Sequence, residues 1–187
     1  MNDQVIEDFL NTGFNLKEHL SSYLSMDMNK IDALISTGTK NMAFLHPGSL
    51  KGDSVSDFYA EKVGDAHLFD LASWHLGSAD YIADTIRLEK MFASGKVLDF
   101  GGGIGTHSIA AALLNQVEHV FFVDLNPYNR EFVLQRAKKL GISESISVHS
   151  NLESLGGNNF DTIICFDVLE HLHNPSAQLL EFQKSIS

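Results

Sequence analysis

The sequence predicts an α/β fold: a Rossmann-like parallel sheet with flanking helices, preceded by an all-helical N-terminal region. Two observations predict it. From residue 96 onward, short apolar runs alternate with helical segments, and this order builds a parallel sheet covered by helices. Before residue 94, apolar residues recur at helical spacing. We therefore divide the chain into a helical lid or accessory region, residues 1–93, and a Rossmann-like ligand-binding domain, residues 94–187.

The helical region is expected to begin with two short helices, whose apolar residues recur at helical spacing: Val5, Ile6, Phe9 and Leu10, then Leu16, Leu20, Tyr23 and Leu24. A third helix is expected after Asp27, a suitable N-cap, with Gly38 beyond its end. A loop around Pro47 and Gly48 follows. Three more helices are expected over about 54–63, 65–76 and 78–93. The last of these begins at Ser78 as N-cap, and its apolar face is formed by Tyr81, Ile82, Ile86 and Met91.

The strands of the sheet are expected over 96–100, 119–124, 145–149 and 160–166, and the alternating helices over 105–114, 127–140 and 175–186. Pro127 suits the first turn of its helix, and Gly141 suits the C-terminal end. The last helix is expected to pack on the sheet through Leu179, Leu180 and Phe182.

A glycine-rich turn after the first strand indicates the kind of site. Gly101, Gly103 and Gly105 alternate between that strand and an alanine-rich helix. Glycines let the backbone adopt positive φ and approach a ligand closely, and the helix N-terminus offers free N–H groups. A dinucleotide fingerprint needs Gly or Ala where Thr106 stands. Asp99 ends the strand, and a carboxylate there suits a ligand that carries a cation rather than a pyrophosphate.

This combination resembles motif I of the class I S-adenosylmethionine-dependent methyltransferases, and the resemblance continues downstream over about residues 95–187. The second strand also ends in an acid, Asp124, and the run Val168-Leu169-Glu170-His171-Leu172 follows the fourth strand. That run is similar to small-molecule methylases of the ubiquinone-biosynthesis type. The resemblance implies a methyltransferase (a transferase) that carries out O-, N- or C-methylation of a small molecule, with S-adenosyl-L-methionine as cofactor.

The resemblance also implies the contacts at the methionine and ribose end of the cofactor. Gly101, Gly103 and Gly105 would form the floor of the site, Asp99 would meet the ammonium group, and Asp124 would accept from both ribose hydroxyls. Two alternatives remain open from the residues alone. Asp99 also suits a helix-cap interaction, and Asp124 also suits a solvated loop acid.

The adenine and sulfonium contacts follow from the same resemblance. Leu125 and Asn126 would flank the adenine, and Asn151 and Leu152, after the third strand, would lie near its amino group. The family often has Asp where Asn151 stands, and Asn offers both an acceptor and a donor. Phe166 would neighbour the sulfonium.

His171 is the candidate catalytic residue, because a histidine pKa suits proton removal from a hydroxyl. The alternative is a helix-start histidine that is hydrogen-bonded to the backbone. Tyr59 and Trp74 are candidates for lining a substrate cavity, although aromatic residues on helices are more often core. The acids and histidines near His171 match no known ligand spacing, so no metal is expected.

The amino-acid composition limits the kinds of binding partner that we expect. The 187 residues carry a net charge of −11, from 13 basic and 24 acidic side chains. An acidic chain with no basic stripe disfavours a nucleic-acid partner and favours a small-molecule substrate. Cys165 is the single cysteine, which fits a reducing, cytoplasmic compartment. No apolar run is long enough to span a membrane, and no signal peptide is expected, so we expect no membrane partner.

The family sheet has seven strands, and only the first four are accounted for, so the C-terminal strands of the family fold are missing and the chain resembles a form truncated after strand four. Strand four would then be an apolar edge, and we expect a partner chain or a homo-oligomer to cover it. Several alternatives stay open: a cofactor-binding but inactive fragment or pseudo-enzyme module, a helical protein-interaction module on a Rossmann-like scaffold, a doubly wound fold without a cofactor, and a nicotinamide or flavin enzyme.

Overall fold

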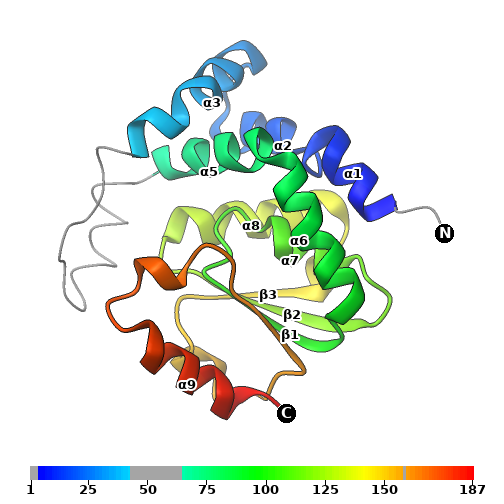
Figure 1. Ribbon diagram of the computed structural model, residues 1–187. Helices are drawn as coiled ribbons and strands as arrows, with labels where there is room; N and C mark the ends of the chain where they lie inside the picture. The colour runs from blue at the N-terminus through cyan, green and yellow to red at the C-terminus, as the bar shows by residue number, and fades with distance from the viewer. Residues whose placement is uncertain (1–3, 43–64, 158) are drawn as a thin grey trace.

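The computed structural model describes residues 4–42, 65–157 and 159–187 (Figure 1). The expected loop at Pro47-Gly48, the expected helix over 54–63 and the candidate residue Tyr59 lie outside the described residues.

The elements follow the predicted order. The N-terminal part contributes helices α1 (Gln4–Thr12), α2 (Leu16–Leu24), α3 (Met28–Met42), α5 (Ala66–Gly77) and α6 (Ala79–Phe92). Strands β1 (Gly95–Phe100), β2 (Val117–Val123), β3 (Ile146–His149) and β4 (Thr162–Ile164) then alternate with α7 (Thr106–Ala112), α8 (Pro127–Leu140) and α9 (Pro175–Ser185). Short 3-10 turns η2 (Ser143–Ser145), η3 (Glu153–Leu155) and η4 (Leu169–His171) lie in the connections.

The four strands form one parallel sheet in the order β3-β2-β1-β4, so β1 is central and its carboxyl end lies beside that of β2. Successive residues of β1 point to opposite faces, and this alternation divides the core. Val97 packs with α6, α7 and α8 in one hydrophobic cluster, whereas Leu98 packs with Phe160 and Phe182 in another. Figure 1 shows the corresponding layers, with α6, α7 and α8 on one side of the sheet and α9 on the other.

The N-terminal helices join this core in two ways. α1 contributes Ile6 and Phe9 to the cluster on the α6–α7–α8 face. A separate cluster among α2, α3 and α5 includes Leu16, Leu20 and Ile104, the last of which belongs to the glycine-rich turn. The helical layer therefore packs directly on the segment that follows β1.

Gly38 differs from its expected role as a helix stop, because α3 continues past it to Met42. A Cβ at Gly38 would lie 2.6 Å from the backbone oxygen of Phe69 in α5, so the glycine allows two helices to approach closely. The expected N-cap at Asp27 is confirmed, since its carboxylate accepts a hydrogen bond from the Lys30 N–H at 3.1 Å. Ser78 lies at the N-cap position of α6, but its side chain makes no capping bond.

The apolar face predicted for α6 is wrong at two positions. Ile82 and Ile86 are buried, whereas Tyr81 and Met91 are exposed, because the buried stripe of α6 continues through Glu89 instead. Because Glu89 is polar, a hydropathy pattern does not place it on the buried face of α6.

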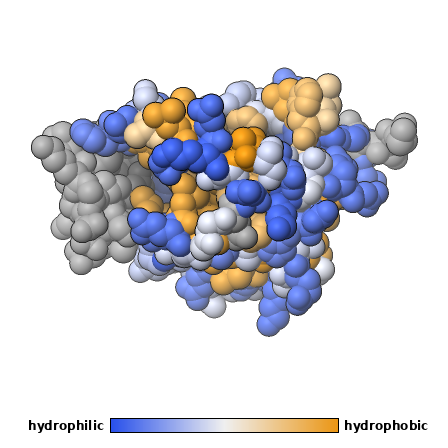
Figure 2. Space-filling model, turned by 90° about the horizontal axis from the view of Figure 1, so that it is seen from below, coloured by the Kyte–Doolittle hydropathy of each residue, from blue (hydrophilic) through white to orange (hydrophobic). Residues whose placement is uncertain are grey.

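The packing predicted for α9 is correct for one residue of three. Phe182 is buried and lies edge-on to the Phe100 ring at 5.2 Å, but Leu179 and Leu180 are exposed. Figure 2 views the molecule from the side of α9 and shows hydrophobic areas between hydrophilic ones on this face.

β4 is shorter than predicted, and the residue Phe160 ahead of it forms an isolated parallel bridge with Ile186.

Candidate functional site

The three alternate glycines all have left-handed backbone conformations, with φ of 72° at Gly101, 55° at Gly103 and 74° at Gly105. A side chain would also clash at two of them. A Cβ at Gly101 would lie 2.5 Å from Val168, and one at Gly105 would lie 2.6 Å from Val133. The conformation of the turn between β1 and α7 therefore requires these alternate glycines.

Asp124 fixes this turn from the neighbouring strand. Its Oδ2 accepts a hydrogen bond from the Gly103 N–H at 2.9 Å, and its Oδ1 accepts from the Asn126 N–H at 2.8 Å and from the Asn129 side chain at 3.3 Å. The residue is only 9% exposed, and burial raises the pKa of its carboxyl to about 6 despite these hydrogen bonds. Asp124 is therefore a structural node rather than a solvated loop acid. Its predicted contact with ribose hydroxyls stays a prediction.

The loop after β2 is fixed by short-range polar contacts. Arg130 donates to the backbone oxygens of Asp124 and Leu125, at 2.7 and 2.8 Å. Asn126 caps α8 by accepting from the Tyr128 N–H. These bonds leave the Leu125 side chain 43% exposed beside the turn, where a flat ligand group can contact it.

Asp99 lies beneath the turn rather than at an open surface. It is 2% exposed, and Ser108 in the first turn of α7 donates to its Oδ2 at 2.5 Å. Burial raises the pKa of the Asp99 carboxyl. This contact matches the helix-start alternative, and the contact of Asp99 with an ammonium group stays a prediction.

Two buried histidines, His107 and His75, pack in the same region. His107 in α7 is hydrogen-bonded to Glu89 in α6. Burial lowers the pKa of His107, but the carboxyl groups of Glu89, Asp99 and Asp167 together outweigh burial and raise that pKa overall. His75 in α5 lies 2.9 Å from the Thr106 hydroxyl, and burial lowers the pKa of His75 to about 3. No sequence spacing signals these contacts, because each joins two different helices.

A polar and aromatic surface lies beside the turn, at the end of β4. The Phe166 ring packs on the buried His107 ring at 4.8 Å. Asp167 has a positive φ of 53°, which is strained for a residue with a side chain, and the Tyr81 hydroxyl donates to its Oδ1 at 3.3 Å. The Trp74 ring lies 6.2 Å from that of Tyr81, and both residues are exposed. Tyr81 was missed as a site residue because its helical position resembled a core position.

The remaining predicted site residues lie on loops. His171 is exposed in η4, and its backbone N–H donates to the Val168 oxygen. Asn151 is exposed, with its Oδ1 accepting from the Ser154 N–H at 2.9 Å, and Leu152 is half-buried. The roles of all three stay predictions.

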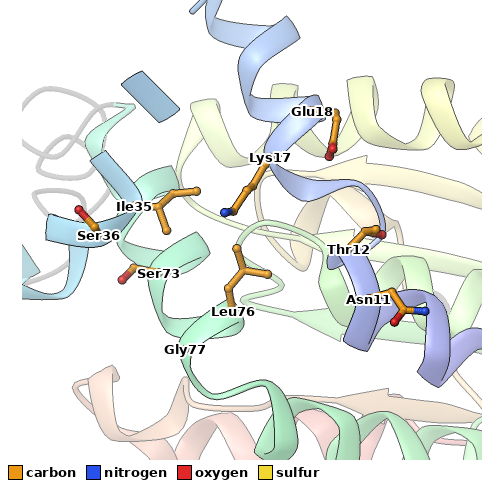
Figure 3. A pocket seen from close by; sticks show the side chains of 9 residues that line it. All are labelled: Asn11, Thr12, Lys17, Glu18, Ile35, Ser36, Ser73, Leu76 and Gly77. Carbon is orange, nitrogen blue, oxygen red and sulfur yellow. The ribbon is translucent and has the colours of Figure 1, made fainter. Parts of the chain in front are cut away.

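Two cavities lie among the described residues, and the glycine-rich turn lines neither of them. One, of about 520 Å³, lies among α1, α2, α3 and α5, and Figure 3 shows polar side chains such as Thr12 and Lys17 around it. The other, of about 350 Å³, lies among α6, β4 and α9. The described residues contain no group of three or more acidic, histidine or cysteine side chains placed to hold a metal ion. None of the helices in the described ranges is long and apolar enough to cross a membrane.

Comparison with known proteins places the chain among the methyltransferases. A family described as "Methyltransferase domain" matches residues 73–187. Ribosomal RNA small subunit methyltransferase G of Methylibium petroleiphilum is 29% identical over 89 residues, which cover 48% of this chain and 40% of that protein. The chain therefore spans less than half the length of this relative.

A solved structure, the O-methyltransferase from Bacillus cereus in complex with SAH, aligns with 95% of this chain and 70% of its own. The TM-score is 0.45 at 13% sequence identity. The family match itself spans more than half of the 187 residues, and its start at residue 73 takes in α6 as well as the sheet. The chain therefore belongs to the methyltransferase-domain family.

Proposed function

We propose that the chain transfers a methyl group from S-adenosylmethionine to a small molecule. The observation that carries the proposal is the Asp124–Gly103 hydrogen bond, which ties a turn of left-handed glycines to the end of the neighbouring strand. This arrangement puts bare backbone and a carboxylate side by side at the carboxyl edge of a parallel sheet, the usual ligand edge of such folds.

The residues present fit the cofactor. The Asp124 Oδ2 accepts one hydrogen bond from the residues that the structure describes, so it retains a lone pair for a ligand hydroxyl. Among the described residues, a Cβ at Gly103 would meet only the end of the Leu71 side chain, at 3.0 Å, so they leave the backbone bare on this side. Leu125 adds an exposed apolar side chain for the adenine. The Asp99 carboxyl group lies beneath the turn as a hydrogen-bond acceptor, which suits a ligand that carries an ammonium group.

The bound cofactor supplies an electrophilic methyl group, so the protein mainly has to place the acceptor in line with it and keep water away. Phe166 and Trp74 provide apolar area at that position, and Tyr81 and Asp167 provide a donor and an acceptor that orient the acceptor molecule. We assign removal of the acceptor proton to the segment 167–171, which carries the exposed residues Asp167 and His171.

The charge of this surface favours a small molecule over RNA. Asp167 and Glu170 are exposed next to Tyr81, and the chain carries a net charge of −11. Nucleic-acid affinity depends mainly on cations that neutralise phosphates. The relative that acts on ribosomal RNA makes RNA the second candidate acceptor. The likeness of residues 168–172 to small-molecule methylases supports the first candidate.

A labelling experiment tests the proposal. The chain is incubated with methyl-labelled S-adenosylmethionine and, separately, with a deproteinised metabolite extract and with total RNA. We expect label in the metabolite fraction only. Label in RNA would make RNA the acceptor, and label in neither fraction, from a folded chain that binds the cofactor, would support the inactive alternative. The Tyr81→Phe variant is expected to lower transfer without lowering cofactor affinity.

A further inference from the structure

Arg136 is a fully buried cation whose hydrogen bonds within the described part of the chain all go to backbone oxygens. It lies on α8 with 0% exposure, and among the described residues no carboxylate is paired with it. Its guanidinium donates to the Ile104 oxygen at 2.6 Å and to the Gly13 oxygen at 2.8 Å, with a longer bond of 3.4 Å to the Phe14 oxygen. Burial lowers its pKa to about 9, so the group stays charged near neutral pH. Burying a cation is costly, so these carbonyls must compensate it.

The two ends of this contact belong to segments far apart in sequence. Ile104 lies within the glycine-rich turn, between Gly103 and Gly105. Gly13 and Phe14 form the connection between α1 and α2, where Gly13, Phe14 and Asn15 all have φ between 57° and 58°. Three successive left-handed residues, two of them with side chains, are strained. The conformation directs the carbonyls at the end of α1 toward the cation, where the helix dipole also favours positive charge.

Ile104 is held by the helical layer through its side chain as well. It is fully buried in the cluster formed by α2, α3 and α5, with Leu16, Leu20 and Phe132 among its members. The Phe132 ring also lies 5.7 Å from the Arg136 guanidinium carbon. Ile104 is therefore fixed twice. Its side chain packs in the same cluster as Leu16 and Leu20 of α2, and its carbonyl binds the same guanidinium as the Gly13 carbonyl.

We propose that Arg136 is a positioning residue that couples the α1–α2 turn to the glycine-rich turn, so that the N-terminal helices form part of the cofactor site. The coupling rests on the proposed function only where cofactor binding is concerned. Its mechanical part, that a change at the α1–α2 turn loosens the glycine-rich turn, holds without any ligand. The coupling is reciprocal, so a ligand on the glycine-rich turn also steadies the α1–α2 turn.

The first test is made without ligand, by amide hydrogen exchange. Gly13→Ala places a side chain at φ +58°, with its Cβ 3.0 Å from Leu76. We expect this change to speed exchange of the amides over 103–109 as well as at the turn itself. Gly141→Ala is the matched control, because Gly141 has φ +73° and no described residue within 4 Å of the Cβ it would gain. This change should leave exchange over 103–109 unchanged. In an Arg136→Met background, Gly13→Ala should no longer affect 103–109. Unchanged exchange there after Gly13→Ala, or an equal effect in both backgrounds, would overturn the proposal.

The second test measures binding of S-adenosylhomocysteine by calorimetry, at a temperature where circular dichroism shows each variant folded. We expect Arg136→Met and Gly13→Ala each to raise the Kd by about tenfold, and the double variant to raise it no further. Arg136→Lys keeps the charge but loses the forked donors, so its Kd should lie between those of the wild-type chain and Arg136→Met. It replaces Arg136→Met in the experiment if that variant does not fold. Arg87→Met, at an exposed arginine of α6, is the control. If both single variants bind the ligand as tightly as the wild-type chain, the coupling is overturned. If the wild-type chain itself binds no ligand, the proposed function is contradicted, and the hydrogen-exchange experiment alone decides the coupling.

Discussion

The Gly103 N–H donates to the Asp124 carboxylate at 2.9 Å, and this bond joins the turn after β1 to the end of the neighbouring strand β2. One residue thus serves two purposes, because the same carboxylate that shapes the turn is the proposed acceptor for the ribose. The fold and the site are linked at this bond, and a change at Asp124 must affect both.

Asp124→Ala is expected to weaken binding of S-adenosylhomocysteine by about 2–3 kcal/mol, since it deletes a charged acceptor. It should also lower the free energy of unfolding by about 1–3 kcal/mol, because the amides of Gly103 and Asn126 lose their buried acceptor. Urea unfolding and calorimetry measure the two effects. Asp84→Ala, at an exposed acid of α6, should show neither. Full affinity in the folded Asp124→Ala variant would remove Asp124 from the site.

Cofactor affinity should depend on pH through Asp124. Burial raises its pKa to about 6, so the carboxylate that accepts hydroxyls is present above pH 6 and is lost as the pH falls below it. The Kd for S-adenosylhomocysteine should therefore rise by up to about tenfold per pH unit below pH 6. Asp124→Asn should abolish this acid limb. Burial raises the pKa of Asp70 to about 6 as well, so Asp70→Asn is the control that should retain the limb.

Stability should fall in acid through His75. Burial lowers the pKa of His75 in the folded state from the ordinary 6.5 to about 3. Between these two pH values the unfolded chain binds a proton at His75 and the folded chain does not. The free energy of unfolding should therefore decrease as the pH falls from 6.5, by about 1.4 kcal/mol at one pH unit below for this group alone. His75→Gln should reduce the slope of the free energy of unfolding against pH by up to about 1.4 kcal/mol per pH unit below pH 6.5. An unchanged slope would mean that His75 is protonated inside the folded protein.

Two glycine substitutions separate backbone strain from collision. Gly105 and Gly141 have nearly the same φ, 74° and 73°, but a Cβ would lie 2.6 Å from Val133 only at Gly105. Gly141→Ala should lower the free energy of unfolding by about 1–2 kcal/mol, the cost of the left-handed conformation. Gly105→Ala should cost clearly more in the same thermal or urea unfolding experiment. Equal costs would show that α8 moves away easily and that the glycine-rich turn is not tightly packed.

The sheet and its crossover helices were predictable from the sequence, because apolar runs, Pro127 and Gly141 act locally. The role of Gly38 was not, since it depends on how closely α5 approaches. The buried Glu89–His107 pair was missed for a related reason, as polar residues on buried faces imitate a solvated surface in hydropathy. The glycine-rich turn was recognisable because its conformation restricts residue type. Arg136 carried no such signal, as its partners are backbone carbonyls, which every residue has.

The central claim is that the glycine-rich turn and Asp124 form a cofactor site, and direct titration of the chain with S-adenosylhomocysteine tests it. Isothermal calorimetry at pH 7.5 should give saturable binding of one ligand per chain, weakened in Asp124→Ala and unaffected in Asp84→Ala. A chain that is folded by circular dichroism but gives no binding heat with ligand up to about 1 mM, a concentration at the upper end of ordinary KM values, would contradict the account.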